Sequence, residues 1–148
     1  MVLKSNGVNH LYYTGSDTTG GIVGVAISAN LLGPWEDLGS MLTVPNAMLE
    51  SPGVTKYQDK YYLYCNNTRD GPEIRVADTP IGPWSGARKL SPGWAHEFFD
   101  AKDNRPVVSY LTSHAITIEP VFWSKVGVPY PFIGREPDYL FFPRVLSY

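Results

Sequence analysis

The sequence has a single cysteine, no long apolar run and no excess of basic residues. Cys65 is alone among 148 residues, so the chain can form no internal disulfide and offers no thiolate cluster for a metal. No apolar stretch approaches the roughly 20 residues of a membrane-spanning helix. The first ten residues lack the apolar core of a signal peptide, and the net charge of −2 provides no basic field. We therefore expect neither nucleic acid nor membrane as partner, and a cytoplasmic location by default.

Helical periodicity is missing as well, because no stretch of ten or more residues has apolar side chains at positions i, i+3, i+4 and i+7. The sequence instead contains short segments rich in β-branched and aromatic residues, with Gly, Pro, Asn or Asp between them, which is typical of β-strands joined by turns. The pairs Asn6-Gly7 and Asp70-Gly71 are typical of hairpin turns. The fold class is therefore all-β, with strands expected at 10–14, 21–27, 60–65, 74–77 and 106–111.

The most informative feature is a repeat of about 50 residues. A strand with Tyr13 is followed by a second strand and by Gly-Pro-Trp at 33–35, and a strand with Tyr64 is followed in the same way by Gly-Pro-Trp at 82–84. These copies are 49 to 51 residues apart, and a shorter third copy ends at Trp123. A period near 50 with three or four strands per unit is typical of propeller blades, which bury their faces against each other. The recurring tryptophans are then structural.

These units predict a partial β-propeller of about two and a half blades, at 1–46, 47–92 and 93–123, with a C-terminal extension at 124–148. The extension, in particular 136–146, could supply an extra strand or an arm for oligomer formation. We expect a homodimer or a higher oligomer, because open edges and uncovered blade faces favour association. An ordinary β-sandwich with a chance duplication of the Gly-Pro-Trp motif is the alternative.

The motifs resemble blades of the five-bladed propeller glycosidases of glycoside hydrolase family 43, with families 32 and 68 as relatives. Gly-Pro-Trp at 33–35 is similar to a blade end, Glu-Ser-Pro at 50–52 to the opening of the next blade, and Trp-Ala-His-Glu at 94–97 to that of a later one. The resemblance covers about residues 2–123. It implies an inverting enzyme acting on pentose or fructose glycosides, with one Asp as base, a second Asp that tunes and orients, and a Glu as acid.

The resemblance implies that Glu50 is the general acid, on the innermost strand of its blade. The repeat places the tuning Asp before Met1 and the base one blade further upstream, so two of the three carboxylates have no position in this sequence. Glu97 lies 13 residues before Tyr110, close to the 14 that separate Glu50 from Tyr64. This offset predicts a second carboxylate at the propeller axis. The alternatives are a solvated loop carboxylate for Glu50 and an ordinary strand residue for Glu97.

Three further side chains are candidates for the same funnel. Trp94 could stack on a sugar ring, although core packing explains it equally well, and Arg69 could donate to a sugar hydroxyl, although a solvated loop charge is the default. The resemblance implies that His96 helps to hold a central ion through water, for which a structural Ca²⁺ is compatible. A metal site would need a third ligand, and no cofactor is required.

We therefore expect a glycoside hydrolase-like protein that acts on a carbohydrate and is incomplete in its catalytic residues. One alternative is a non-catalytic carbohydrate-binding or assembly module that forms an oligomer, and another is a piece of a longer enzyme. The sequence does not identify the sugar.

Overall fold

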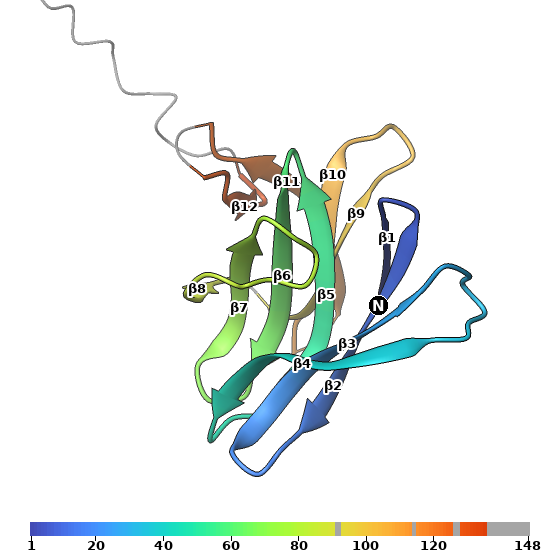
Figure 1. The fold of residues 1–148 in the computed structure, drawn as a ribbon. Helices are drawn as coiled ribbons and strands as arrows, with labels where there is room; N and C mark the ends of the chain where they lie inside the picture. The colour runs from blue at the N-terminus through green and yellow to red at the C-terminus, as the bar shows by residue number, and fades with distance from the viewer. Residues whose placement is uncertain (91–92, 114, 126–127, 136–148) are drawn as a thin grey trace, which may run out of the picture.

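The structure is a computed structural model, and it describes residues 1–90, 93–113, 115–125 and 128–135. These residues form twelve strands in three four-stranded antiparallel sheets (Figure 1). Each sheet is built from strands that follow one another in the sequence, as in a propeller blade. The all-β class and the partial propeller are therefore confirmed. Nowhere in the described ranges is there a helix long and apolar enough to cross a membrane.

The inner strands β1, β5 and β9 lie next to one another, and the later strands of each blade follow outward (Figure 1). Blade 1 contains β1 (Val2–Ser5), β2 (Val8–Ser16), β3 (Gly20–Ser28) and β4 (Glu36–Pro45). Blade 2 contains β5 (Leu49–Tyr57), β6 (Lys60–Asn67), β7 (Gly71–Ala77) and β8 (Arg88–Lys89). Blade 3 contains β9 (Trp94–Asp100), β10 (Pro106–Leu111), β11 (Ile116–Trp123) and β12 (Pro131–Ile133).

Blade 3 has four strands because β12 pairs with the end of β11, from Val121 to Trp123. β12 lies in the 124–148 extension, so the third sheet continues beyond the boundary that the repeat predicts at Trp123. An edge strand of three residues that begins with Pro131 gives no alternating pattern to detect, and proline suits an edge because it cannot donate to a ladder. The strand expected within 136–146 lies outside the described residues.

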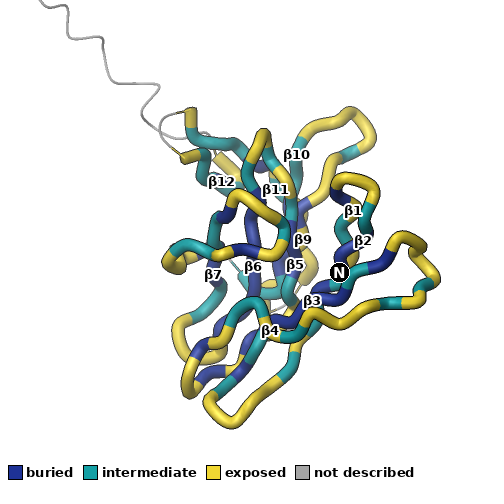
Figure 2. The backbone as a smooth tube through the Cα atoms, viewed as in Figure 1, coloured by how far each residue is buried: buried dark blue, intermediate teal, exposed yellow. Residues whose placement is uncertain are grey.

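The centre of the fold is β6, whose residues from Tyr61 to Asn67 are all buried (Figure 2). Its side chains alternate between two apolar clusters. Tyr61, Leu63 and Cys65 pack in the cluster shared with blade 1, whereas Tyr62 and Tyr64 pack in the cluster shared with blade 3. A strand that is buried on both faces is expected to be a continuous apolar run, which is what the sequence has here.

The two Gly-Pro-Trp motifs have a common structural role. Gly33 has a φ of 89° and Gly82 a φ of 93°, a backbone region that favours glycine. A Cβ atom at either position would also lie 3.0 Å from the following tryptophan ring. Trp84 packs against the cluster between blades 1 and 2, and Trp123 packs against the cluster between blades 2 and 3. These contacts agree with the structural role expected for Trp84 and Trp123, whereas Trp35 belongs to neither cluster.

Replacing Leu63 by alanine should be strongly destabilising, because this side chain is fully buried at the interface of blades 1 and 2. A buried Leu→Ala change costs about 2–5 kcal/mol through lost burial and the cavity left behind. Chemical unfolding followed by tryptophan fluorescence measures the loss. Leu32→Ala is the matched control, since Leu32 is 92% exposed and its truncation should change stability little. Equal effects of the two substitutions would contradict the blade packing.

Cys65 should be unreactive in the folded protein, since burial raises the pKa of its thiol to about 12. At pH 8 only about one thiol in ten thousand would then be ionised, and the thiolate is the reactive form. A chromogenic disulfide reagent should label Cys65 slowly in buffer and completely in guanidinium. Rapid labelling of the native protein would show that β6 is accessible, contrary to the fold described.

Candidate functional site

The beginnings of the inner strands meet around one cavity of about 210 Å³. Its walls come from Ser51–Gly53 on β5 and Ala95–Glu97 on β9, together with Met1 at the start of blade 1 and Tyr64 on β6. All three blades therefore contribute to it. This is the position in which the sequence predicts a funnel lined by residues from successive blades.

Both β5 and β9 have a β-bulge at this cavity. In β5 the chain from Glu50 to Gly53 contains one residue more than its partner segment on β6, and Ser51 has a φ of 49°. In β9 the chain from Trp94 to Glu97 has the same excess over β10, and Ala95 has a φ of 52°. Bulges redirect side chains and are frequent next to active sites. Left-handed residues other than glycine are also enriched at functional sites, since they store backbone strain.

The strand pairing at the two bulges shows that Glu50 and Glu97 do not occupy equivalent positions, although their distances in sequence from Tyr64 and Tyr110 suggest that they do. Glu50 is paired with Asn66, and the equivalent residue of blade 3 is Trp94, which is paired with Leu111. Glu97 corresponds in this register to Gly53. Counting residues back from Tyr64 and from Tyr110 does not reveal this difference. Tyr64 is paired with Gly53, whereas the residue paired with Glu97 is Ser109, one position before Tyr110.

The two carboxylates lie differently with respect to the cavity. Glu97 is exposed and lines it, whereas Glu50 is exposed and directly precedes Ser51, the first lining residue of β5. Both carboxylates are therefore accessible at the start of an inner strand. The roles of Glu50 as acid and Glu97 as a second carboxylate stay predictions.

His96 lies in the same cavity wall but is buried, with its ring stacked on Tyr110 at a centroid distance of 5.4 Å. Within the described ranges no three His, Cys, Asp or Glu side chains form a group that could hold a metal ion. The described donor set thus does not fit a directly bound ion. A water-mediated role for His96 and a structural Ca²⁺ stay predictions.

Tyr64 connects all three blades at the cavity. Its hydroxyl donates to Met1 Sδ at 3.0 Å and accepts a long hydrogen bond from the backbone N–H of Phe98 at 3.4 Å. Burial raises the pKa of Tyr64, so the phenol stays protonated and can donate. The sequence identifies this residue only as an aromatic member of the repeat, because its hydrogen bonds join segments that are distant in sequence.

Asn66 is a polar residue of the site that the sequence does not reveal. It is 1% exposed, and its Oδ1 accepts a hydrogen bond from the backbone N–H of Ala95 at 3.1 Å, which joins blade 2 to the bulge of blade 3. Its Nδ2 has no hydrogen-bond partner among the residues that the structure describes. A buried donor without a partner is costly. This donor lies beside Glu50 in register and could serve a water molecule or a bound hydroxyl.

The other two predicted binding residues have structural contacts. Arg69 donates to Asp70 Oδ2 from Nε and a terminal nitrogen, at 3.0 and 2.6 Å, and to the carbonyl of Pro45 at 2.9 Å. These bonds tie the β6–β7 turn to the end of β4. Trp94 is partly buried at the start of β9. Sugar binding by Arg69 or Trp94 stays a prediction.

Several solved structures with this fold are named as glycosidases. An α-L-arabinofuranosidase from Clostridium thermocellum superposes with a TM-score of 0.64 at 19% identity, over 89% of this chain and 54% of the other. An endo-arabinase from Bacteroides thetaiotaomicron gives 0.60 at 21%, over 89% and 54%. A thermostable family-43 glycoside hydrolase gives 0.59 at 21%, over 93% and 53%. No protein-family model and no curated protein matches the sequence.

At these identities the likeness establishes the fold, which is that of a part of the family 43 propeller. The chain spans about half the length of these structures. The family resemblance seen in the sequence is thereby supported by the three-dimensional arrangement.

Asn66→Ala should lower the free energy of unfolding by about 1–3 kcal/mol, because the N–H of Ala95 would lose its acceptor in a buried position. Thermal or chemical unfolding measures the change. Asn30→Ala is the control, since Asn30 is exposed and its Oδ1 accepts from the N–H of the exposed Leu32. No difference between the two variants would show that Asn66 does not join blades 2 and 3.

Proposed function

We propose that this chain is a glycoside hydrolase-like protein that binds a carbohydrate where its inner strands begin, with Glu50 as the general acid. The observation that carries the proposal is the pair of bulges, at Ser51 and Ala95, around a cavity to which all three blades contribute. Structures with the same blades are named as an arabinofuranosidase, a xylanase and an exo-β-1,3-galactanase. Pentose glycosides are therefore substrates to test, with galactosides beside them, and the resemblance in the sequence adds fructose glycosides.

The chemistry needs a proton donor and a base on opposite sides of the scissile bond. Glu50 is exposed and thus accessible to a leaving-group oxygen. An inverting mechanism also requires a carboxylate about 6.5–9.5 Å away that activates water. Glu97 is the exposed carboxylate that lines the cavity, and it is the candidate base within this chain.

Among the described residues, no blade lies against the outer faces of blades 1 and 3. On blade 3 the exposed side chains Phe99, Leu111, Ile116 and Ile118 share one face, as the strand register requires. Ile116 and Ile118 are 72% and 61% exposed. An apolar sheet face of this kind is a site of association.

A second copy of the chain is the occupant that we propose for these faces. A copy turned by a half turn about the propeller axis would place its blade 1 against blade 3 and its blade 3 against blade 1, giving a ring of six blades, one more than in the five-bladed enzymes that the motifs resemble. Glu50 and Glu97 of both copies would then line one funnel. If such a dimer binds sugar without turnover, the chain is a non-catalytic carbohydrate-binding module.

Hydrolysis of aryl pentosides and aryl fructosides by the purified chain tests the proposed acid. Glu50→Gln keeps the size of the side chain but cannot donate a carboxylic proton, so the rate should fall by about 10²–10⁴-fold. Glu36→Gln is the matched control, because Glu36 is an exposed carboxylate on β4 in blade 1 and should leave the rate unchanged.

The hydrolysis assay distinguishes an enzyme that uses Glu50 as its acid from a protein that only binds carbohydrate. Turnover that disappears only with Glu50→Gln supports the assignment. Turnover that survives in Glu50→Gln would exclude Glu50 as the acid. An absence of turnover on every substrate would remove the enzymatic function and leave carbohydrate binding.

A further inference from the structure

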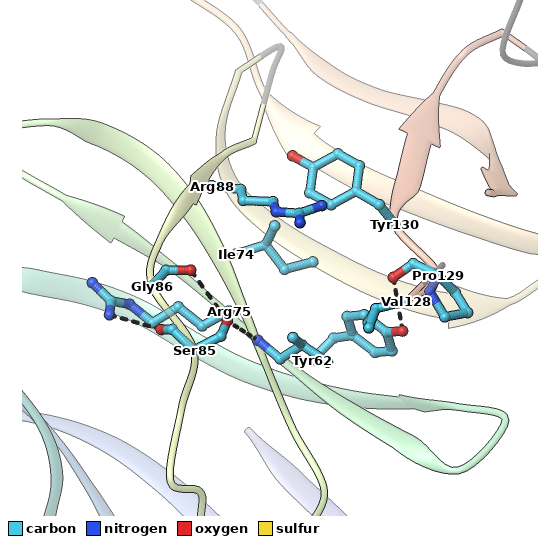
Figure 3. A pocket seen from close by; sticks show the side chains of 10 residues that line it. Tyr62, Ile74, Arg75, Ser85, Gly86, Arg88, Val128, Pro129 and Tyr130 are labelled. Carbon is cyan, nitrogen blue, oxygen red and sulfur yellow. Dashed lines mark hydrogen bonds between the residues drawn. The ribbon is translucent and has the colours of Figure 1, made fainter. Parts of the chain in front are cut away.

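A second cavity lies outside the blade centre, between the outer strands of blade 2 and the chain that leads into β12. Its volume is about 320 Å³, within the range of small-molecule sites. Ile74 of β7 lies on one side of the cavity, and Val128, Pro129 and Tyr130 lie on the facing side (Figure 3). Val76 of β7 also lines the cavity. It shares no lining residue with the cavity at the inner strands.

The facing walls are held together by hydrogen bonds. The hydroxyl of Tyr62 donates to the carbonyl of Pro129 at 2.8 Å (Figure 3). The hydroxyl of Tyr130 donates to the carbonyl of Lys89. Burial raises the pKa of Tyr62 to about 12 and also raises that of Tyr130, so both remain donors over the physiological range. The cavity is therefore formed before a ligand arrives, which lowers the ordering cost of binding.

The charge at the cavity is positive and uncompensated. The guanidinium of Arg88 lies over the ring of Tyr130, 5.4 Å from its centroid, and within the described ranges no carboxylate lies within ion-pair distance of it. Arg75, the other arginine at the cavity, is engaged with Glu73 Oε1 at 2.7 Å and with the carbonyl of Ser85 at 3.2 Å. Arg88 is thus a cation at the mouth of an apolar cavity, on a chain of net charge −2.

We infer that this cavity binds the carboxylate-bearing ring of an acidic sugar, a hexuronate. The carboxylate would accept two parallel hydrogen bonds from Arg88, the arrangement that a guanidinium favours. The C–H faces of the pyranose ring would pack on Val128, Ile74 and the ring of Tyr130. A neutral sugar would form no ion pair with Arg88, and a small inorganic anion would make no contact with the apolar walls. The choice of a carbohydrate rests on the proposed function.

Binding of methyl glucuronoside, measured by calorimetry or by chemical-shift titration, tests the inference, with methyl glucoside as the neutral probe. The glucuronoside should bind at least tenfold more tightly, because a hydrogen-bonded charge contributes about 1.5–3 kcal/mol. Arg88→Gln should remove this preference. Arg105→Gln is the control, since Arg105 is an exposed arginine paired with Asp103 in the β9–β10 turn and should leave binding unchanged.

A second pair of variants tests the location without touching Arg88. Val128 is 48% exposed, so substitutions there should be tolerated in the fold. Val128→Glu should repel the carboxylate and weaken glucuronoside binding by about tenfold or more, whereas Val128→Gln, of the same size, should have a smaller effect.

Three results would overturn the inference: equal affinity for the neutral glucoside, unchanged affinity in Arg88→Gln, or displacement of the glucuronoside by sulfate or benzoate at the same concentration. The Glu50→Gln variant keeps this cavity and should bind glucuronoside as the unaltered chain does. Arg88→Gln should keep any hydrolysis of neutral glycosides. Glucuronoside binding therefore tests the cavity at Arg88, and hydrolysis of neutral glycosides separately tests the proposed site at the inner strands.

Discussion

The structure depends on the burial of one strand from both sides. Along β6, Leu63 and Cys65 face blade 1 while Tyr62 and Tyr64 face blade 3, so blade 2 holds its neighbours together through alternate side chains of a single strand. No blade could bury both of its faces alone. The alternation also fixes the register, because a slip of one residue would exchange the two sets.

This stacking determines where chemistry can occur. It brings the starts of β1, β5 and β9 to one place, where Tyr64 and Asn66 link the blades by hydrogen bonds and the bulges at Ser51 and Ala95 distort the strand beginnings. The same stacking leaves one face of blade 1 and one of blade 3 open. The functional proposal and the assembly proposal therefore follow from the same arrangement, one at the axis and the other at the open faces.

The sequence predicted the parts of the fold that repeat. Each of the strands expected from β-branched and aromatic runs is present, and so is the serial order of the blades. It did not predict β1 or β4, and β8 and β12, with two and three residues, have no measurable period. Glu50, Glu97 and His96 were predicted near the axis and lie at the inner strands. Asn66 could not be predicted, because its contact with Ala95 joins positions 29 residues apart in different blades.

Sedimentation equilibrium of the purified chain tests most directly whether the open faces are covered by a second copy that completes the funnel. The account predicts a mass about twice the 16.5 kDa of one chain. It also predicts a shift to the single-chain mass in Ile118→Lys, which places a charge on the exposed face of blade 3. A monomer at all concentrations, with or without added carbohydrate, would contradict the account, since Glu50 and Glu97 would then lack the second set of blades that a closed funnel requires.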